Sequence, residues 1–143
     1  EHMKRLWMDA PGMVYRPMIS KEMIDQGRHI PMMDGRFVFK HAVTRMPQAL
    51  LGVLAANDVS PDDIDLFLFH QANLRINEFV AQRLKVDPGK VFNNIQKYGN
   101  TSAATLPICL DECVRSGRSK AGDLITMTGF GSGFTWGSAL IRL

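Results

Sequence analysis

The sequence predicts an α/β domain built on a mixed sheet, and three observations lead to that fold class. The chain has 143 residues, of which 45% are hydrophobic and 22% are charged, so it can bury the core of one ordinary globular domain. Short apolar runs alternate with stretches of helical periodicity. Near the C-terminus, two strand-like segments flank a glycine-rich turn.

Proline and glycine interrupt the first 33 residues repeatedly, and no clean period is visible there. One short helix could begin in this segment, with Ser20 as its N-cap. We expect residues 1–33 to be irregular loops around that helix, and residues 34–143 to form the α/β domain. No window is apolar over the roughly 18 residues that a membrane helix needs, and no apolar run follows the first residues. We therefore expect neither a membrane segment nor a signal peptide.

The first half of the expected domain alternates strands with helices. Residues 36–40 (RFVFK) alternate and are rich in aromatic side chains, which predicts a strand. Residues 43–57 carry an apolar stripe at helical spacing, and residues 60–63 (SPDD) are typical of a turn or a one-turn helix. Residues 66–69 (LFLF) have the pattern of a strand buried on both faces.

A second helix is expected over residues 74–84. Its predicted inner side consists of Ile76, Phe79, Val80 and Leu84. Residues 91–92 predict a short strand, and residues 97–102 a loop that ends in a helix cap. Residues 103–115 then predict a third helix.

The C-terminal segment predicts a hairpin. Residues 124–128 form its first strand, residues 129–133 (GFGSG) its turn, and residues 134–143 its last strand. The aromatic residues Phe37 and Phe134 are expected to belong to the core.

The charge balance does not support a nucleic-acid-binding function. Lysine and arginine exceed aspartate and glutamate by 17 to 14, a formal charge of +3 without a dense basic face. Several basic residues fall between residues 75 and 97, where a solvated surface is the ordinary interpretation. The balance is also compatible with an acidic protein partner.

The two cysteines, Cys109 and Cys113, are four residues apart in an expected helix and have acidic neighbours. A thiolate is disfavoured there, so we interpret them as reduced, structural residues of a cytoplasmic protein. No metal-ligand spacing accompanies them, and the sequence has neither a serine nucleophile elbow nor a phosphate loop. We expect no metal.

Three segments could form a site at one edge of the sheet. His70, Asn100 and the 129–133 turn each follow an expected strand or precede a helix, which is where sites form in open α/β folds. Each also has a structural interpretation. The histidine could be a hydrogen-bonded structural residue, the asparagine a turn residue, and the glycines a tight hairpin or a set of backbone donors for an oxyanion.

Three motifs in this order resemble the C-terminal half of β-ketoacyl-acyl-carrier-protein synthase III. They are residues 70–75 (HQANLR), 98–104 (YGNTSAA) and 129–137 (GFGSGFTWG), and residues 34–40 (DGRFVFK) resemble the same family. The resemblance runs from about residue 34 to the C-terminus. It implies a thiolase-like fold, and residues 34–143 would be the C-terminal domain of such a synthase.

The resemblance also implies a function and its residues. In the family, malonyl-acyl carrier protein loses carbon dioxide and the carbanion attacks an acyl group, delivered by acyl-coenzyme A, on a cysteine. His70 and Asn100 would be the catalytic pair that stabilises the enolate, and the backbone N–H of Ser132 would serve the oxyanion hole. Asn73 would lie near the pantetheine arm, with Arg75 and Arg83 on the face that meets the acidic carrier protein. Ser132 stands where the family usually has glycine, and a positive φ would be harder for it.

The resemblance further implies that the nucleophilic cysteine lies in a first half, which this sequence does not contain. We expect a separated C-terminal half that is inactive alone, a homodimer in the complete enzyme, a cytoplasmic location and no bound cofactor. Two alternatives remain. One is a related acyltransferase without decarboxylation, and the other a non-catalytic fragment that binds carrier protein.

Overall fold

The computed structural model describes residues 2–143, which fall into two units. One unit comprises the segment up to residue 40 together with residues 131–135. The other comprises residues 41–130 and 136–143. None of the helices in residues 2–143 is long and apolar enough to cross a membrane.

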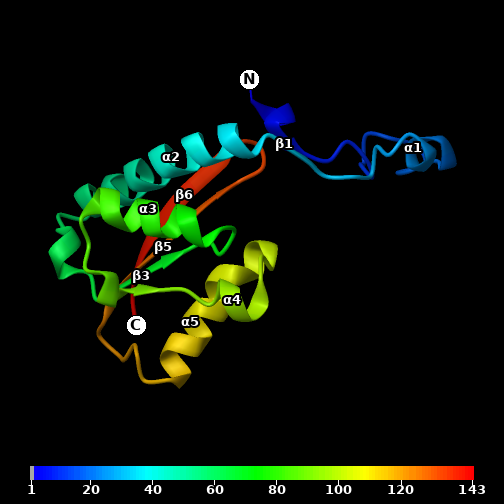
Figure 1. Cartoon of the computed structure of the whole chain (residues 1–143). Helices are drawn as coiled ribbons and strands as arrows, with labels where there is room; N and C mark the ends of the chain where they lie inside the picture. The colour runs from blue at the N-terminus through cyan, green and yellow to red at the C-terminus, as the bar shows by residue number, and fades with distance from the viewer. Residues whose placement is uncertain (1) are drawn as a thin grey trace. The chain divides into compact units, whose positions relative to one another are not determined.

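A four-stranded sheet is the centre of the larger unit, with strand order β4-β3-β5-β6 (Figure 1). The strands are β3 (Leu66–Phe69), β4 (Val91–Phe92), β5 (Leu124–Gly131) and β6 (Thr135–Arg142). β3 runs parallel to both of its neighbours, with Leu68 opposite Phe92 on one side and Met127 on the other. All four residues of β3 are buried, which confirms the prediction from the LFLF run.

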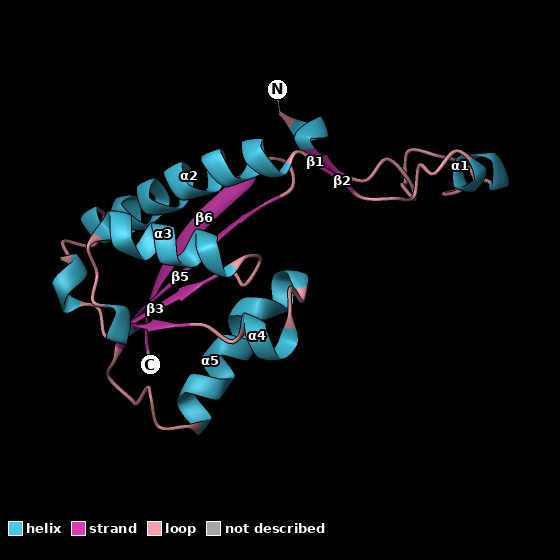
Figure 2. Cartoon of the chain, in the orientation of Figure 1, coloured by secondary structure: helices cyan, strands magenta, loops and turns pink. Residues whose placement is uncertain are grey.

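Helices cover both faces of this sheet (Figure 2). α3 (Leu74–Leu84) and the larger unit's part of α2 (Gly35–Ala55) lie on one face, and α5 (Thr105–Arg115) lies on the other. The core under α5 joins its two cysteines to apolar residues of β3 and β5: Leu66, Leu68, Cys109, Cys113 and Ile125. The predicted α/β class with a mixed sheet is confirmed.

The expected strand at residues 36–40 is wrong, because this segment forms the first turns of α2. Asp34 starts the helix by accepting hydrogen bonds from Phe37 N through its side chain and from Val38 N through its carbonyl oxygen. The residues that α2 buries follow a spacing of three or four: Val38, Ala42, Val43, Met46, Leu50 and Leu54. The alternation of two phenylalanines over five residues was too short to separate the two periods.

Smaller differences concern the other elements. α3 has the predicted bounds, but Phe79 is 45% exposed and the buried amide Asn77 takes a place on the inner face. The expected 97–102 loop begins as the short helix α4 (Ile95–Tyr98), and α5 starts at Thr105 after a 3-10 turn. β5 continues through Gly131, so the reversal falls on the next three residues.

The smaller unit holds the two-stranded pair β1 (Leu6–Trp7) and β2 (Met32–Met33) and the five-residue helix α1 (Lys21–Asp25). The Ser20 side chain accepts a hydrogen bond from Met23 N, which confirms it as the cap of α1. Phe37 and Phe134 lie within this unit, with ring centroids 6.0 Å apart. Both are half-buried and neither is among the buried core residues, so the core placement expected for them is not confirmed.

Candidate active site

His70 directly follows β3, and the sheet fixes its backbone. The backbone N–H of His70 donates to the Thr128 carbonyl oxygen on β5 at 2.9 Å. Gly129 lies close by, since a Cβ added to it would be 3.8 Å from the Cβ of His70. The half-buried ring has Nδ1 2.6 Å from Thr105 Oγ1. Burial lowers the pKa of His70, which favours a neutral imidazole at pH 7. Nε2 makes no hydrogen bond within residues 2–143, so it is available to a ligand.

Asn100 lies on the exposed segment between α4 and the 3-10 turn before α5. Its Oδ1 accepts a hydrogen bond from Ser102 N at 2.9 Å, which is an Asx turn. Only an oxygen can accept from that N–H, so the orientation of the amide is set and its NH₂ group points away from the turn. The Nδ2 atom has no partner in the part of the chain that the structure describes. Asn100 is therefore a turn residue and an available donor at once.

Two residues connect the histidine to the asparagine. Thr105 Oγ1, which contacts His70, also lies 3.1 Å from the Ser102 carbonyl oxygen, and Ser102 N binds Asn100. Ser102 has φ 54°, a left-handed conformation that is unusual for a residue other than glycine. The backbone N–H of Thr105 also donates to the Ser102 carbonyl oxygen, so His70 and Asn100 are joined in one hydrogen-bonded network. This bears out the expected clustering for two of the three segments, whereas residues 131–133 belong to the other unit.

Gln71 holds the segment that leads to Asn100 against the end of β3. Its side chain is fully buried, and its Oε1 accepts from Asn94 N at 3.1 Å and from Ile95 N at 3.2 Å. Its Nε2 donates to the Phe69 carbonyl oxygen at 2.7 Å and to Asn93 Oδ1 at 3.3 Å. This glutamine was not among the site residues that the sequence predicted. The available signal was a long polar side chain two residues after a wholly apolar strand.

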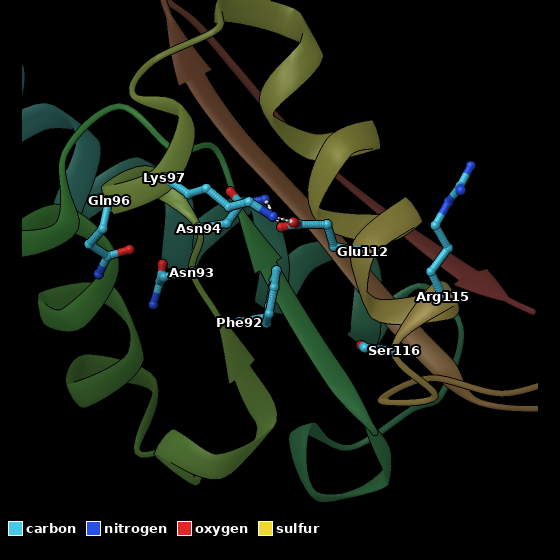
Figure 3. Close-up of a pocket in the computed structure, with 8 residues that line it drawn as sticks. All are labelled: Phe92, Asn93, Asn94, Gln96, Lys97, Glu112, Arg115 and Ser116. Carbon is cyan, nitrogen blue, oxygen red and sulfur yellow. Dashed lines mark hydrogen bonds and ion pairs between the residues drawn. The ribbon is translucent and has the colours of Figure 1, made fainter.

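Glu112 on α5 binds Lys97 of α4 and Asn94, which directly precedes α4 (Figure 3). Its carboxylate accepts from Lys97 Nζ at 2.5 Å, and from Asn94 Nδ2 and Tyr98 Oη, each at 2.8 Å. These hydrogen bonds, the one from Lys97 first, lower the pKa of Glu112 from 4.5 to about 2. Asn94, Lys97 and Glu112 of this cluster line the pocket drawn in Figure 3, and none of the predicted site residues does.

Ser132 lies in the smaller unit, where its Oγ donates to the Leu6 carbonyl oxygen at 2.6 Å. The expected difficulty of a positive φ does not arise, because Gly133 and not Ser132 adopts that conformation, with φ 136°. A Cβ on Gly133 would lie 2.7 Å from Thr135 Cγ2, so the glycine is required there. The backbone role predicted for Ser132 stays a prediction.

The three residues predicted to meet carrier protein or pantetheine are exposed and lie on or next to α3. Asn73 caps α3, since its Oδ1 accepts from Arg75 N at 3.0 Å. The Arg75 side chain has no partner among the described residues. Arg83 Nη1 lies 3.5 Å from the Val43 carbonyl oxygen, which the missing N–H of Pro47 leaves without its helical donor. That contact is structural, so Arg75 is the freer of the two cations.

Both cysteines are fully buried and free. Burial raises the pKa of Cys109 to about 12 and that of Cys113 to about 11, so neither is a thiolate at neutral pH. Cys109 Sγ donates to Asn94 Oδ1 at 3.0 Å. Their interpretation as structural residues is supported. Within residues 2–143, no group of three or more histidine, cysteine, aspartate or glutamate side chains could hold a metal ion.

Comparison with known proteins gives the family. Residues 54–143 match the family described as 3-oxoacyl-[acyl-carrier-protein] synthase III C terminal. The chain belongs to this family. The chain is 50% identical over 135 residues to the β-ketoacyl-[acyl-carrier-protein] synthase III of Roseiflexus sp. (strain RS-1). This alignment covers 94% of this chain and 40% of the relative. The Caldanaerobacter subterraneus relative is 45% identical and covers 97% of this chain, so the likeness to the synthase III family extends into the first 33 residues.

Solved synthase III structures agree. The Thermus thermophilus enzyme superimposes with a TM-score of 0.85 at 35% identity, over 99% of this chain and 42% of its own. The Aquifex aeolicus enzyme gives a TM-score of 0.79 at 47% identity, over 80% of this chain and 37% of its own. These likenesses confirm the predicted thiolase-like fold. The chain spans about 40% of the length of the curated synthase III relatives that it matches.

Proposed function

We propose that this chain supplies the His70–Asn100 donor pair of a 3-oxoacyl-[acyl-carrier-protein] synthase III. One observation carries the proposal. In each side chain one polar atom is held by a neighbour, His70 Nδ1 by Thr105 and Asn100 Oδ1 by Ser102. The other nitrogen of each, Nε2 and Nδ2, is left without a partner among the described residues. Such a pair suits one carbonyl oxygen that gains charge during a reaction.

The reaction that fits is decarboxylative Claisen condensation. When the malonyl thioester loses carbon dioxide, the electron pair of the broken C–C bond passes into an enolate and places negative charge on the thioester oxygen. Donors fixed in advance stabilise that oxygen more in the transition state than in the ground state, so they accelerate the step. The enolate carbon then attacks an acyl-cysteine thioester, and the cysteine leaves as a thiolate.

The nucleophilic cysteine would come from the remaining length of the synthase, because both thiols of this chain are buried and protonated. The proposal therefore assigns no synthase activity to the chain alone. It includes a homodimeric complete enzyme in the cytoplasm, acyl-coenzyme A and malonyl-acyl carrier protein as substrates, and no bound cofactor. Arg75 would meet the acidic carrier protein, with Arg83 beside it and Asn73 close to the pantetheine arm. The backbone N–H of Ser132 would serve the oxyanion hole for the acyl-cysteine.

A hybrid enzyme tests the proposal. This chain replaces the aligned segment of the Roseiflexus synthase, and carbon dioxide release from malonyl-acyl carrier protein is measured. His70→Ala and Asn100→Ala should each lower the rate by about 10²–10³-fold, the usual effect of one lost oxyanion donor. Acylation of the cysteine by acyl-coenzyme A should persist in both. His29→Ala, an exposed histidine of the smaller unit, is the control. Unchanged carbon dioxide release in both site variants would refute the proposal.

A further inference from the structure

We propose that Thr105 is a positioning residue that fixes the tautomer of His70. Its hydroxyl donates a hydrogen bond to His70 Nδ1, which places the single proton of the neutral ring on Nε2. The functional consequence of this inference rests on the proposed function, since the Nε2–H is the donor that the thioester oxygen would need. The inference about the tautomer itself rests only on the geometry around the ring.

Thr105 is suited to act on the ring because it is held rigidly. It is the first residue of α5, is only 2% exposed, and places Oγ1 2.6 Å from His70 Nδ1. The hydroxyl carries one proton and has a second neighbour, the Ser102 carbonyl oxygen at 3.1 Å. If the proton points to Ser102, Nδ1 must be the donor. If it points to His70, Nδ1 must accept, and the ring proton is on Nε2.

Two observations decide between these states. The 2.6 Å from Thr105 Oγ1 to His70 Nδ1 is shorter than the range of about 2.7–3.2 Å for an N–H donor to oxygen, and the 3.1 Å from Oγ1 to the Ser102 carbonyl oxygen is longer than the range of about 2.5–3.0 Å for a hydroxyl donor to oxygen. The Ser102 carbonyl oxygen also already accepts a hydrogen bond from the backbone N–H of Thr105. This carbonyl oxygen therefore keeps a donor when the hydroxyl proton goes to Nδ1, and both acceptors are then satisfied.

The surroundings of the ring support the same state. No carboxylate pairs with His70 in the described part of the chain, and burial alone lowers its pKa. A carboxylate partner would accept from Nδ1 and hold the proton there, as in hydrolase triads. A hydroxyl partner that donates has the opposite effect. A threonine at this position thus turns the histidine into an Nε2–H donor without giving it a charge.

Nitrogen NMR on the ¹⁵N-labelled 143-residue chain tests the inference without any activity assay. Long-range ¹H–¹⁵N spectra report which ring nitrogen of His70 carries the proton. The wild-type chain should show protonated Nε2 and an Nδ1 resonance displaced by an accepted hydrogen bond. Thr105→Val should move the Nδ1 resonance toward that of a free lone pair, and Thr105→Ser should restore it. Thr126→Val is the matched control, because it removes a buried threonine hydroxyl that has no hydrogen-bond partner among residues 2–143.

A wild-type spectrum with protonated Nδ1, or an Nδ1 resonance that Thr105→Val leaves in place, overturns the inference. If Thr105→Val does not fold, the wild-type spectrum and Thr105→Ser decide. The outcome is independent of the proposed function. An Nε2–H tautomer together with undiminished decarboxylation in His70→Ala hybrids would leave the positioning role intact and remove the function.

Discussion

Replacing Gln71 by methionine should destabilise the chain by about 3 kcal/mol. The side chain is fully buried, and methionine fills a similar volume without any polar atom. The exchange removes the partners of the buried Asn94 N–H and the buried Phe69 carbonyl oxygen, and of the half-buried Ile95 N–H. A buried polar group left unpaired costs about 1–3 kcal/mol. Two such groups, whose costs do not add fully, account for the predicted destabilisation of about 3 kcal/mol.

Urea denaturation followed by circular dichroism measures this loss as a change in the free energy of unfolding. Gln96→Met is the matched control, because Gln96 is exposed and makes no hydrogen bond among the described residues. It should change stability by less than about 0.5 kcal/mol. Equal effects of the two variants would refute the reasoning that the Gln71 amide holds α4 against the end of β3.

Three further predictions concern the core, the cysteines and the acid stability. Leu50→Ala, at a fully buried position of α2, should cost about 2–5 kcal/mol in urea denaturation, whereas Leu51→Ala, which is 47% exposed, should cost less than about 1; similar costs would contradict the assigned face of the helix. Iodoacetamide at pH 8 should leave both thiols unmodified in the native chain and alkylate both in urea, because they are buried with pKa values of about 12 and about 11. Fast native alkylation seen by mass spectrometry would argue against that burial. Glu112→Gln should flatten the acid side of the stability curve between pH 4.5 and about 2, since the folded carboxylate has the lower pKa and its stabilising contribution is lost as the pH falls through that range. If the free energy of unfolding falls equally steeply with decreasing pH in both chains between pH 4.5 and about 2, the prediction is contradicted.

The sequence predicted elements whose ends carry local signals. The strand at residues 66–69 was correct because four apolar residues lie between a turn and a polar segment. The bounds of α3 were correct because Asn73 is a strong N-cap. Residues 36–40 failed because five residues fit both the strand and the helix period, and the helix is decided by burial further along the chain.

The sequence predicted the two candidate donor residues of the site but not the side chains that hold them in place. His70 and Asn100 stood out because each follows or precedes a regular element, and the motifs around them pointed to a family that the comparison confirms. Thr105 contacts His70, which lies 35 positions away in the sequence, and Gln71 contacts Asn94, which lies 23 positions away. No local periodicity in the sequence reveals such contacts. Glu112 likewise needs α4 and α5 to be packed before its partners are known.

Asn100→Asp in the hybrid synthase tests the central claim most directly. Aspartate keeps an oxygen that accepts from Ser102 N–H, so the turn is retained, but it has no N–H to donate to a substrate. If Asn100 is a donor to the malonyl thioester oxygen, carbon dioxide release should fall by about 10²-fold or more while the cysteine is still acylated. If the rate of release stays at the wild-type level, Asn100 is a turn residue only, and the His70–Asn100 pair is not the catalytic device of this chain.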